Sequence, residues 1–303
     1  MLNASRGLLT FAGAALAASP VAGQPLPVVL SSDCGTEIDD QWQVIYLAIS
    51  PELEPLGFIG NHARNGLTGA MARDTMLDVL ASRLGLASHP PVLAGSDAPL
   101  AAPDRPNDNE AVRFLLEASQ RFSPAQRLNV LIIGSHTDVA SAILTDPTIV
   151  QRIRVIMMGM VGWPGGSDEW NVKNDPDAAR VVFDSGVPLV VGCSEVCIRD
   201  LSFTTEECQA LVGDLGPCGA WLAKSFAEFG GRLDHEGRKV WPIWDVITGA
   251  YLLGFATVTE YHRPRIGTDL LFDHTNPRGQ LTWVTRVDTQ RFWADFAAKL
   301  RGR

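Results

Sequence analysis

The stretch "VVLSSDCGTEIDDQWQVIYLAIS", residues 28–50, contains the pattern that decides the fold. It begins with an apolar, β-branched run, which is typical of a buried strand, and ends with a run of helical periodicity. Four carboxylates stand between the two runs: Asp33, Glu37, Asp39 and Asp40. A strand that leads directly into a helix is the unit of a parallel sheet, so these carboxylates are expected at the carboxyl end of a strand.

The same alternation continues along the chain. Apolar runs predict strands at residues 27–32, 53–61, 90–95, 127–135, 152–159 and 187–193. Helical patterns occur at residues 39–49, 69–85, 107–121, 136–144 and 175–186. This order predicts an α/β fold with an open, mostly parallel, doubly wound sheet and helices on both faces. We expect a single domain with a helical C-terminal part from about residue 200, in which residues 281–288 form a late strand or hairpin.

Polar segments follow several of the predicted strands. Besides the acidic segment at 33–40, they are "GNHARN" at 60–65, "GSHTD" at 134–138 and "GMVGWPGGSDEWN" at 159–171. Open parallel sheets bind their ligands outside the carboxyl ends of the strands. The four segments are therefore expected to meet at one edge of the sheet.

Composition narrows the class of partner. The chain has 303 residues, of which 46% are hydrophobic and 19% charged, and its net charge is −9. It supplies no basic face, which argues against binding to nucleic acid or to anionic membranes. A small molecule is the expected partner.

The five cysteines lack the spacing of a zinc site. Their odd number leaves at least one unpaired, for which Cys34 is the first candidate.

The first 24 residues have the composition of a targeting segment. One arginine precedes an apolar run at residues 8–18, and small residues and a proline follow it. This pattern is typical of a secretory signal peptide, with a membrane-tethering N-terminus as the alternative. We therefore predict a signal peptide at 1–24, one domain at 25–303, and a periplasmic or secreted location.

Crowded carboxylates need an explanation, because like charges raise each other's pKa. A divalent cation with oxygen ligands, Ca²⁺ or Mg²⁺, would remove the repulsion. The alternative is that Asp39 and Asp40 only stabilise a helix N-terminus. That alternative leaves Asp33 and Glu37 unexplained, so the residues themselves favour a metal site.

Six segments, in this order, are similar to segments of one known family. They are "DCGTEIDD" (33–40), "GFIGN" (57–61), "VLAG" (92–95), "IIGSHTDVASAIL" (132–144), "EWNVKNDPDAARVVFDSGVPLVV" (169–191) and "WDVITGAYLL" (244–253). Through them the chain resembles the calcium-dependent nucleoside hydrolases, of the inosine- and uridine-preferring type. The resemblance covers most of the chain beyond the predicted signal peptide.

The resemblance implies a role for each matching residue. The implied Ca²⁺ ligands are Asp33, Asp40, Thr137 through its backbone carbonyl, and Asp245. The implied sugar-binding residues are Asp39, Asn61, Glu169 and Asn171. Asp33 would also be the general base. Trp244 stands where many members have a leaving-group histidine, and would stack on the base, although a buried packing role is the alternative.

The implied function is that of an N-glycosyl hydrolase. It would cleave the N-glycosidic bond of ribonucleosides, purines slightly favoured, with a Ca²⁺-activated water, and it is expected to form a homo-oligomer (dimer or tetramer). His136 is a candidate for an extra acid, or simply a helix-capping or surface residue. Two alternatives remain: a non-catalytic, calcium-dependent ribose- or nucleoside-binding protein, and a hydrolase of another N-ribosyl compound.

Removal of the signal peptide can be measured directly. Protein recovered from an exported fraction is expected to lack residues up to about Gln24, because signal peptidase cleaves after the small residues that follow the apolar run. Intact-mass spectrometry of natively expressed protein checks this. Soluble protein that retains Met1 would contradict the prediction.

Overall fold

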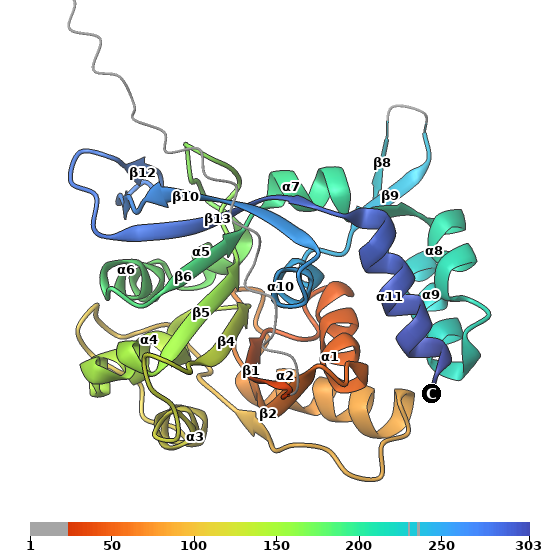
Figure 1. The fold of residues 1–303 in the computed structure, drawn as a ribbon, viewed down its shortest axis with the longest axis horizontal. Helices are drawn as coiled ribbons and strands as arrows, with labels where there is room; N and C mark the ends of the chain where they lie inside the picture. Colours follow the sequence, from red (N-terminus) through yellow and green to blue (C-terminus); the bar gives the residue numbers. More distant parts are fainter. Residues whose placement is uncertain (1–23, 230, 235–236) are drawn as a thin grey trace, which may run out of the picture.

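The structure is a computed structural model, and it describes residues 24–229, 231–234 and 237–303. At its centre lies a twisted sheet that is parallel except at one edge (Figure 1). In spatial order its strands are β10 (Ala256–His262), β13 (Gln280–Val287), β6 (Leu189–Gly192), β5 (Ile153–Met158), β4 (Leu128–Ile133), β1 (Leu26–Ser32), β2 (Leu53–Gly60) and β3 (Val92–Ala94). The predicted signal peptide lies outside the described residues, except for Gln24.

The strand order confirms the doubly wound topology. From β3 to β6 the order is 3-2-1-4-5-6, and all of these strands pair in parallel. In the centre, Leu30 of β1 pairs with Phe58 of β2 on one side and Leu131 of β4 on the other. The direction of winding reverses between β1 and β4, and crevices at such a reversal are the usual ligand sites of this fold.

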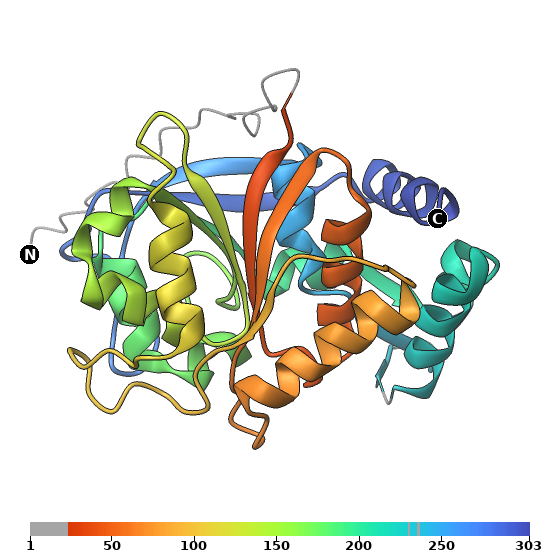
Figure 2. The ribbon, with the colours of Figure 1, turned by 90° about the horizontal axis from the view of Figure 1, so that it is seen from below.

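Helices cover both faces of the sheet, as Figure 2 shows. One face carries α3 (Glu110–Ser119), α4 (Thr137–Thr145) and α6 (Pro176–Asp184). The other carries α1 (Asp39–Ile49), α2 (Gly69–Leu77), the π-helical segment η1 (Asp78–Arg83) and α10 (Val246–Leu252). The strands between them are buried on both sides: Val28, Val29 and Leu30 of β1 are fully inaccessible to solvent. For this reason the sequence of each of these strands is a continuous apolar run rather than an alternation of apolar and polar residues.

The C-terminal helix α11 (Thr289–Arg301) packs on α1 through an aromatic layer. The Trp42 ring of α1 lies 5.2 Å from Phe296 and 5.8 Å from Trp293, and Tyr46 stacks on Phe296 at 5.6 Å. α1 is thus held from both sides, by the sheet and by α11. Its first turn, which carries the acidic residues, therefore has a fixed position.

Smaller elements complete the described part of the chain. The helices are η2 (Pro147–Gln151), α5 (Trp170–Asn174), α7 (Ser194–Asp200), α8 (Thr205–Val212) and α9 (Gly216–Glu228). The strands form two small sheets, one of β7 (Ser202–Thr204), β9 (Lys239–Pro242) and β8 (Arg232–Leu233), the other of β11 (Arg265–Ile266) and β12 (Phe272–Asp273).

The predicted elements up to residue 193 are all present, with small shifts at their ends. The late strand at 281–288 is β13, which joins the main sheet beside an antiparallel edge strand, β10. Neither β10 nor the small sheets were predicted, because their residues are partly exposed and lack long apolar runs. All five cysteines are buried and unpaired. No helix among the described residues is both long and apolar enough to span a membrane.

Candidate active site

A cavity of about 240 Å³ lies at the carboxyl ends of the central strands. Its volume is slightly below the range typical of small-molecule sites, about 300–1,000 Å³. Its walls come from the segments after β1, β5 and β6, from the last residues of β4 and β5, and from four residues further along the chain, Arg232, Trp241, Trp244 and Asp245. The lining residues are Asp33, Thr36, Glu37, Asp39, Asp40, Ile133, Met158, Glu169, Trp170, Asn171, Ser194, Arg232, Trp241, Trp244 and Asp245.

The acidic segment forms a turn between β1 and α1. Gly35 takes a φ of +112°, a conformation that costs other residues strain, and this lets the chain reverse direction after Asp33. α1 then begins at Asp39, so Asp39 and Asp40 stand in its first turn. Carboxylates are stabilised there by the unpaired backbone N–H groups and the helix dipole. In addition, the Ser32 hydroxyl donates a hydrogen bond to Oδ1 of Asp40 at 2.6 Å.

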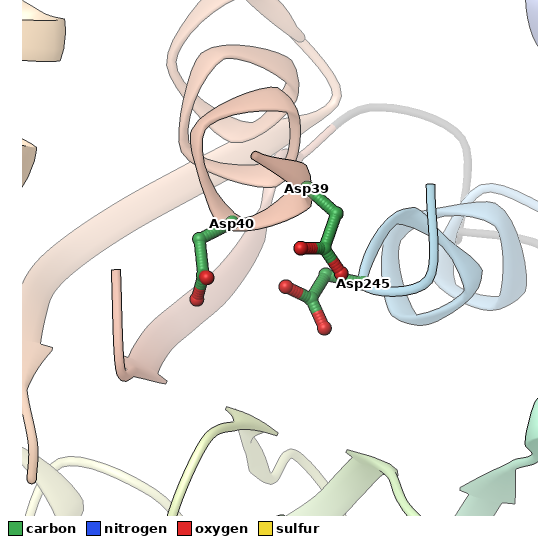
Figure 3. A group of neighbouring side chains, drawn as sticks. All are labelled: Asp39, Asp40 and Asp245. Atoms are coloured by element: carbon green, nitrogen blue, oxygen red, sulfur yellow. The ribbon is translucent and has the colours of Figure 1, made fainter. Parts of the chain in front are cut away.

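Three buried carboxylates converge at one end of the cavity (Figure 3). Asp39 and Asp40 come from the start of α1, and Asp245 from the residue immediately before α10. One oxygen of each lies within 4.8 Å of one oxygen of both others, and each residue is at most 4% exposed. Burial first, and then repulsion from neighbouring carboxylates, Glu37 and Asp33 among them, raises the pKa of all three carboxyl groups well above the ordinary range.

The chemistry of this cluster fits a hard divalent cation. None of the three carboxylates forms an ion pair with a described lysine or arginine. Oxygen-only ligand sets of this kind suit Ca²⁺ or Mg²⁺. Sequence comparison predicted Asp40 and Asp245 as ligands and Asp39 as a sugar-binding residue. The structure places Asp39 in the same close cluster, while the sugar contact of Asp39 stays a prediction.

Asp33 lines the same cavity but is not part of the 4.8 Å cluster. Its Oδ2 accepts hydrogen bonds from Thr36 Oγ1 at 3.2 Å, Trp170 Nε1 at 3.3 Å and Asn174 Nδ2 at 3.3 Å. Burial raises the pKa of Asp33 to about 7, and the three donors oppose that rise. A carboxylate that is fixed in orientation and has a pKa near neutrality is suited to general-base catalysis.

Glu169 and Asn171, which the resemblance predicts to bind the sugar, also line the cavity. Glu169 Oε2 caps α5 by accepting hydrogen bonds from the backbone N–H groups of Asn171 at 2.9 Å and Val172 at 3.2 Å. Burial raises the pKa of Glu169 to about 8. The Asn171 side chain donates to the backbone oxygen of Met158 at the end of β5. Whether these two residues contact a sugar stays a prediction.

Asn61 and Thr137 lie outside the cavity lining in the described part of the chain. The Asn61 amide donates to Ser31 Oγ and accepts from the Ser135 N–H, so it ties the ends of β1, β2 and β4 together. The Thr137 hydroxyl donates to Asp175 Oδ2 at 2.8 Å and lies 2.9 Å from His62 Nε2. These hydrogen bonds give both residues positioning roles. Their predicted contacts with sugar and cation stay predictions.

His136 does not line the cavity either. It is fully buried, and burial lowers its pKa to about 4, so the ring is neutral at ordinary pH. Although His136 precedes α4, its side chain makes no capping hydrogen bond. The suggestions of an extra acid and of a capping or surface role are therefore wrong for this residue.

An aromatic wall closes the end of the cavity beside Asp245. Trp244 lines it, as predicted, and Trp241 meets Trp244 edge-on with ring centroids 5.9 Å apart. Trp241 Nε1 donates to Glu37 Oε2 at 3.1 Å, which links the wall to the acidic segment. The sequence analysis assigned no role to Trp241, Arg232 or Trp170. Trp170 stands in the sequence between two predicted site residues, Glu169 and Asn171, and this position could have predicted that it lines the cavity. No predicted site residue is adjacent to Arg232 in the sequence.

Comparison with known proteins agrees with this geometry. The family model of the inosine-uridine preferring nucleoside hydrolases matches residues 28–294. A pyrimidine-specific ribonucleoside hydrolase, RihB, from Escherichia coli O17:K52:H18 (strain UMN026 / ExPEC) is 27% identical over 89% of this chain and 96% of its own length. An uncharacterized protein, C1683.06c, from Schizosaccharomyces pombe is 26% identical over 71% of this chain and 79% of its own length.

Solved structures share the fold at lower identity. A plant nucleoside hydrolase, PpNRh1, superposes with a TM-score of 0.74 at 18% identity, covering 92% of this chain and all of that one. A purine-preferring ribonucleoside hydrolase from Gardnerella vaginalis gives a TM-score of 0.72 at 19% identity, covering 91% and 98%. At these identities the similarity shows a common fold.

The close packing around Asp33 can be tested at Gly134. A Cβ atom at this position would lie 2.5 Å from the Asp33 backbone nitrogen and 2.5 Å from Asn61 Oδ1. Gly134→Ala is therefore expected to lower the free energy of unfolding by about 1–3 kcal/mol, the usual cost of overpacking. Urea denaturation measures it. The matched control is Gly165→Ala, where a Cβ meets no atom within 4 Å; equal stability of the two variants would contradict the prediction.

Proposed function

Because the chain belongs to the inosine-uridine preferring nucleoside hydrolase family, we propose that it hydrolyses the N-glycosidic bond of ribonucleosides with one bound Ca²⁺, and that purine nucleosides are slightly favoured. Membership of the family confirms the resemblance found in the sequence. The observation that carries the proposal is the placement of Asp33 beside a cluster of three buried carboxylates in one cavity.

The cation would be held by Asp39, Asp40 and Asp245, with Asp33 next to them. When bound, Ca²⁺ would supply the positive charge that offsets the repulsion among these carboxylates and lowers the pKa of water at the site. We retain Ca²⁺ over Mg²⁺ because the resemblance is to calcium-dependent enzymes. The ligand chemistry itself suits either ion.

Asp33 is proposed to accept the proton of the attacking water. All three of its hydrogen-bond donors use Oδ2, which leaves Oδ1 to take the proton. As the glycosidic bond breaks, its electron pair leaves with the base, which takes a proton from solvent, and positive charge develops on the ribosyl ring that the water attacks. The carboxylates on this side of the cavity stabilise that charge, because they are fixed before the reaction begins.

The leaving base is proposed to lie against Trp244, at the aromatic end of the cavity. A bicyclic purine gains more contact with an indole than a pyrimidine does, which supports the purine preference. The curated RihB relative is named as pyrimidine-specific, so pyrimidine nucleosides are the alternative substrates. The presence of Asp33 in the cavity favours catalysis over simple binding. An exported location and a homo-oligomeric state stay predictions.

Calcium binding is expected to stabilise the fold. A ligand that binds only the native state adds about 2.7 kcal/mol at one hundred times its Kd. Adding Ca²⁺ to chelator-treated protein should therefore raise Tm by several degrees, and the rise should shrink as the pH falls, because the ligands must be deprotonated. Asp245→Asn should abolish the rise, whereas Asp168→Asn, at an exposed carboxylate, should keep it. No thermal shift, together with no calcium in metal analysis, would contradict the site.

Substitutions of Asp33 and of Trp244 are expected to lower catalysis in different ways. Asp33→Asn removes the base, so kcat should fall by about 10²–10⁴-fold on every substrate with calcium saturating. Trp244→Ala removes base stacking, so a purine nucleoside should suffer while a nitrophenyl riboside, with its activated leaving group, is largely spared. Steady-state kinetics on both substrates, with Asp108→Asn as the exposed control, measures this.

One outcome for each variant would contradict the role proposed for the substituted residue. A near-normal kcat for Asp33→Asn would show that Asp33 is not the base. An equal loss on both substrates for Trp244→Ala would make Trp244 a packing residue and remove the main support for the purine preference.

A further inference from the structure

A second cavity of about 180 Å³ adjoins the active-site cavity. The two cavities share three lining residues, Arg232, Trp241 and Trp244, so the indole rings form a common wall. The complete lining of the second cavity is Ile198, Ser202, Arg232, Leu233, Asp234, Val240, Trp241, Pro242 and Trp244. It lies between α7 and the β8–β9 hairpin, which projects from the body of the molecule (Figure 1).

This second cavity is predominantly apolar although it opens to solvent. Ile198 is 53% exposed and Leu233 is 73% exposed, which is unusual for side chains of this size. Together with Val240 and Pro242 they extend the aromatic wall of the active site outward. Contiguous exposed apolar surface of this kind usually marks a binding region. Here it shares Arg232, Trp241 and Trp244 with the cavity in which the nucleoside is proposed to bind.

The residues that line the two cavities indicate which part of a substrate reaches the second cavity. The carboxylate cluster of Asp39, Asp40 and Asp245 occupies one end and suits the cation and the sugar. Trp241 and Trp244 line the part of the cavity beside Asp245, where the leaving base is proposed to stack. A group attached to the base and pointing away from the sugar would pass the two indoles and come next to Ile198 and Leu233.

We propose that the second cavity binds an apolar substituent on the leaving base, so that the preferred substrates are ribonucleosides whose base carries an alkyl or aryl group. This inference rests on the proposed function and adds the substrate class to it. Each methylene that is removed from water improves binding about fourfold. A butyl group that is only half buried would therefore improve kcat/KM by at least tenfold.

The test compares adenosine with N6-butyladenosine, which differ only in the substituent. The wild-type, calcium-loaded enzyme should show a kcat/KM at least tenfold higher for N6-butyladenosine. In the double variant Ile198→Ser, Leu233→Ser that ratio should fall to near one. Met71→Ser is the matched control, because Met71 is also 53% exposed but does not line either cavity; its ratio should equal that of the wild type.

The outcomes separate this inference from the function on which it rests. Hydrolysis of adenosine at a rate equal to or above that of N6-butyladenosine overturns the inference and leaves the proposed function standing. Persistence of the preference in the double variant overturns the assignment to this cavity. If the double variant instead changes the sedimentation coefficient of the protein, the surface is a contact between copies of this chain. Hydrolysis of neither compound overturns the inference, and the proposed function falls with it only if inosine and uridine, assayed beside them, are not hydrolysed either.

Discussion

Repulsion among buried carboxylates is the constraint on which the rest of this structure depends. Asp39, Asp40 and Asp245 lie within a few ångströms of one another, nearly inaccessible to solvent, without a lysine or arginine partner among the described residues. Such an arrangement is unfavourable for the protein alone, since the helix N-terminus and the Ser32 hydroxyl offset only part of the desolvation and the repulsion. A bound divalent cation would make it favourable. We therefore expect the protein to be more stable with the cation bound than without it.

The fold brings these charges together with a small number of elements. β1 and its neighbours fix the position of Asp33, and the first turn of α1 carries two of the three clustered carboxylates. The third precedes α10, which packs beside α1. Both helices therefore direct their N-termini at the same point, where partial positive charge favours anions. The aromatic layer between α1 and α11 then prevents α1 from moving away from the repulsion.

Local patterns in the sequence predicted what depends on local chemistry. The central strands could be predicted because burial on both faces makes them uniformly apolar, and the acidic cluster could be predicted because four carboxylates stand within eight residues. Residues whose roles depend on distant partners could not. Asn61 bridges three strand ends, and His136 is fully buried at the start of α4; neither fact is visible from sequence neighbours. The edge strand β10 was missed because only two of its seven residues are buried, which weakens the apolar signal.

The acidic and the aromatic residues of the site come from different kinds of chain segment, and this difference bears on which base the enzyme accepts. The acids that would hold the cation and take the proton come from short motifs at the ends of buried elements. Trp241 and Arg232, by contrast, belong to a hairpin that projects from the body and makes few contacts with the sheet. Substitution or change of length in that hairpin would alter the aromatic end of the cavity while leaving the carboxylate end intact. One scaffold could therefore keep a single bond-breaking chemistry and vary the base that leaves, because Trp241 and Arg232 come from a different segment of the chain than the acids of β1 and α1, to which Trp241 is linked by its hydrogen bond to Glu37.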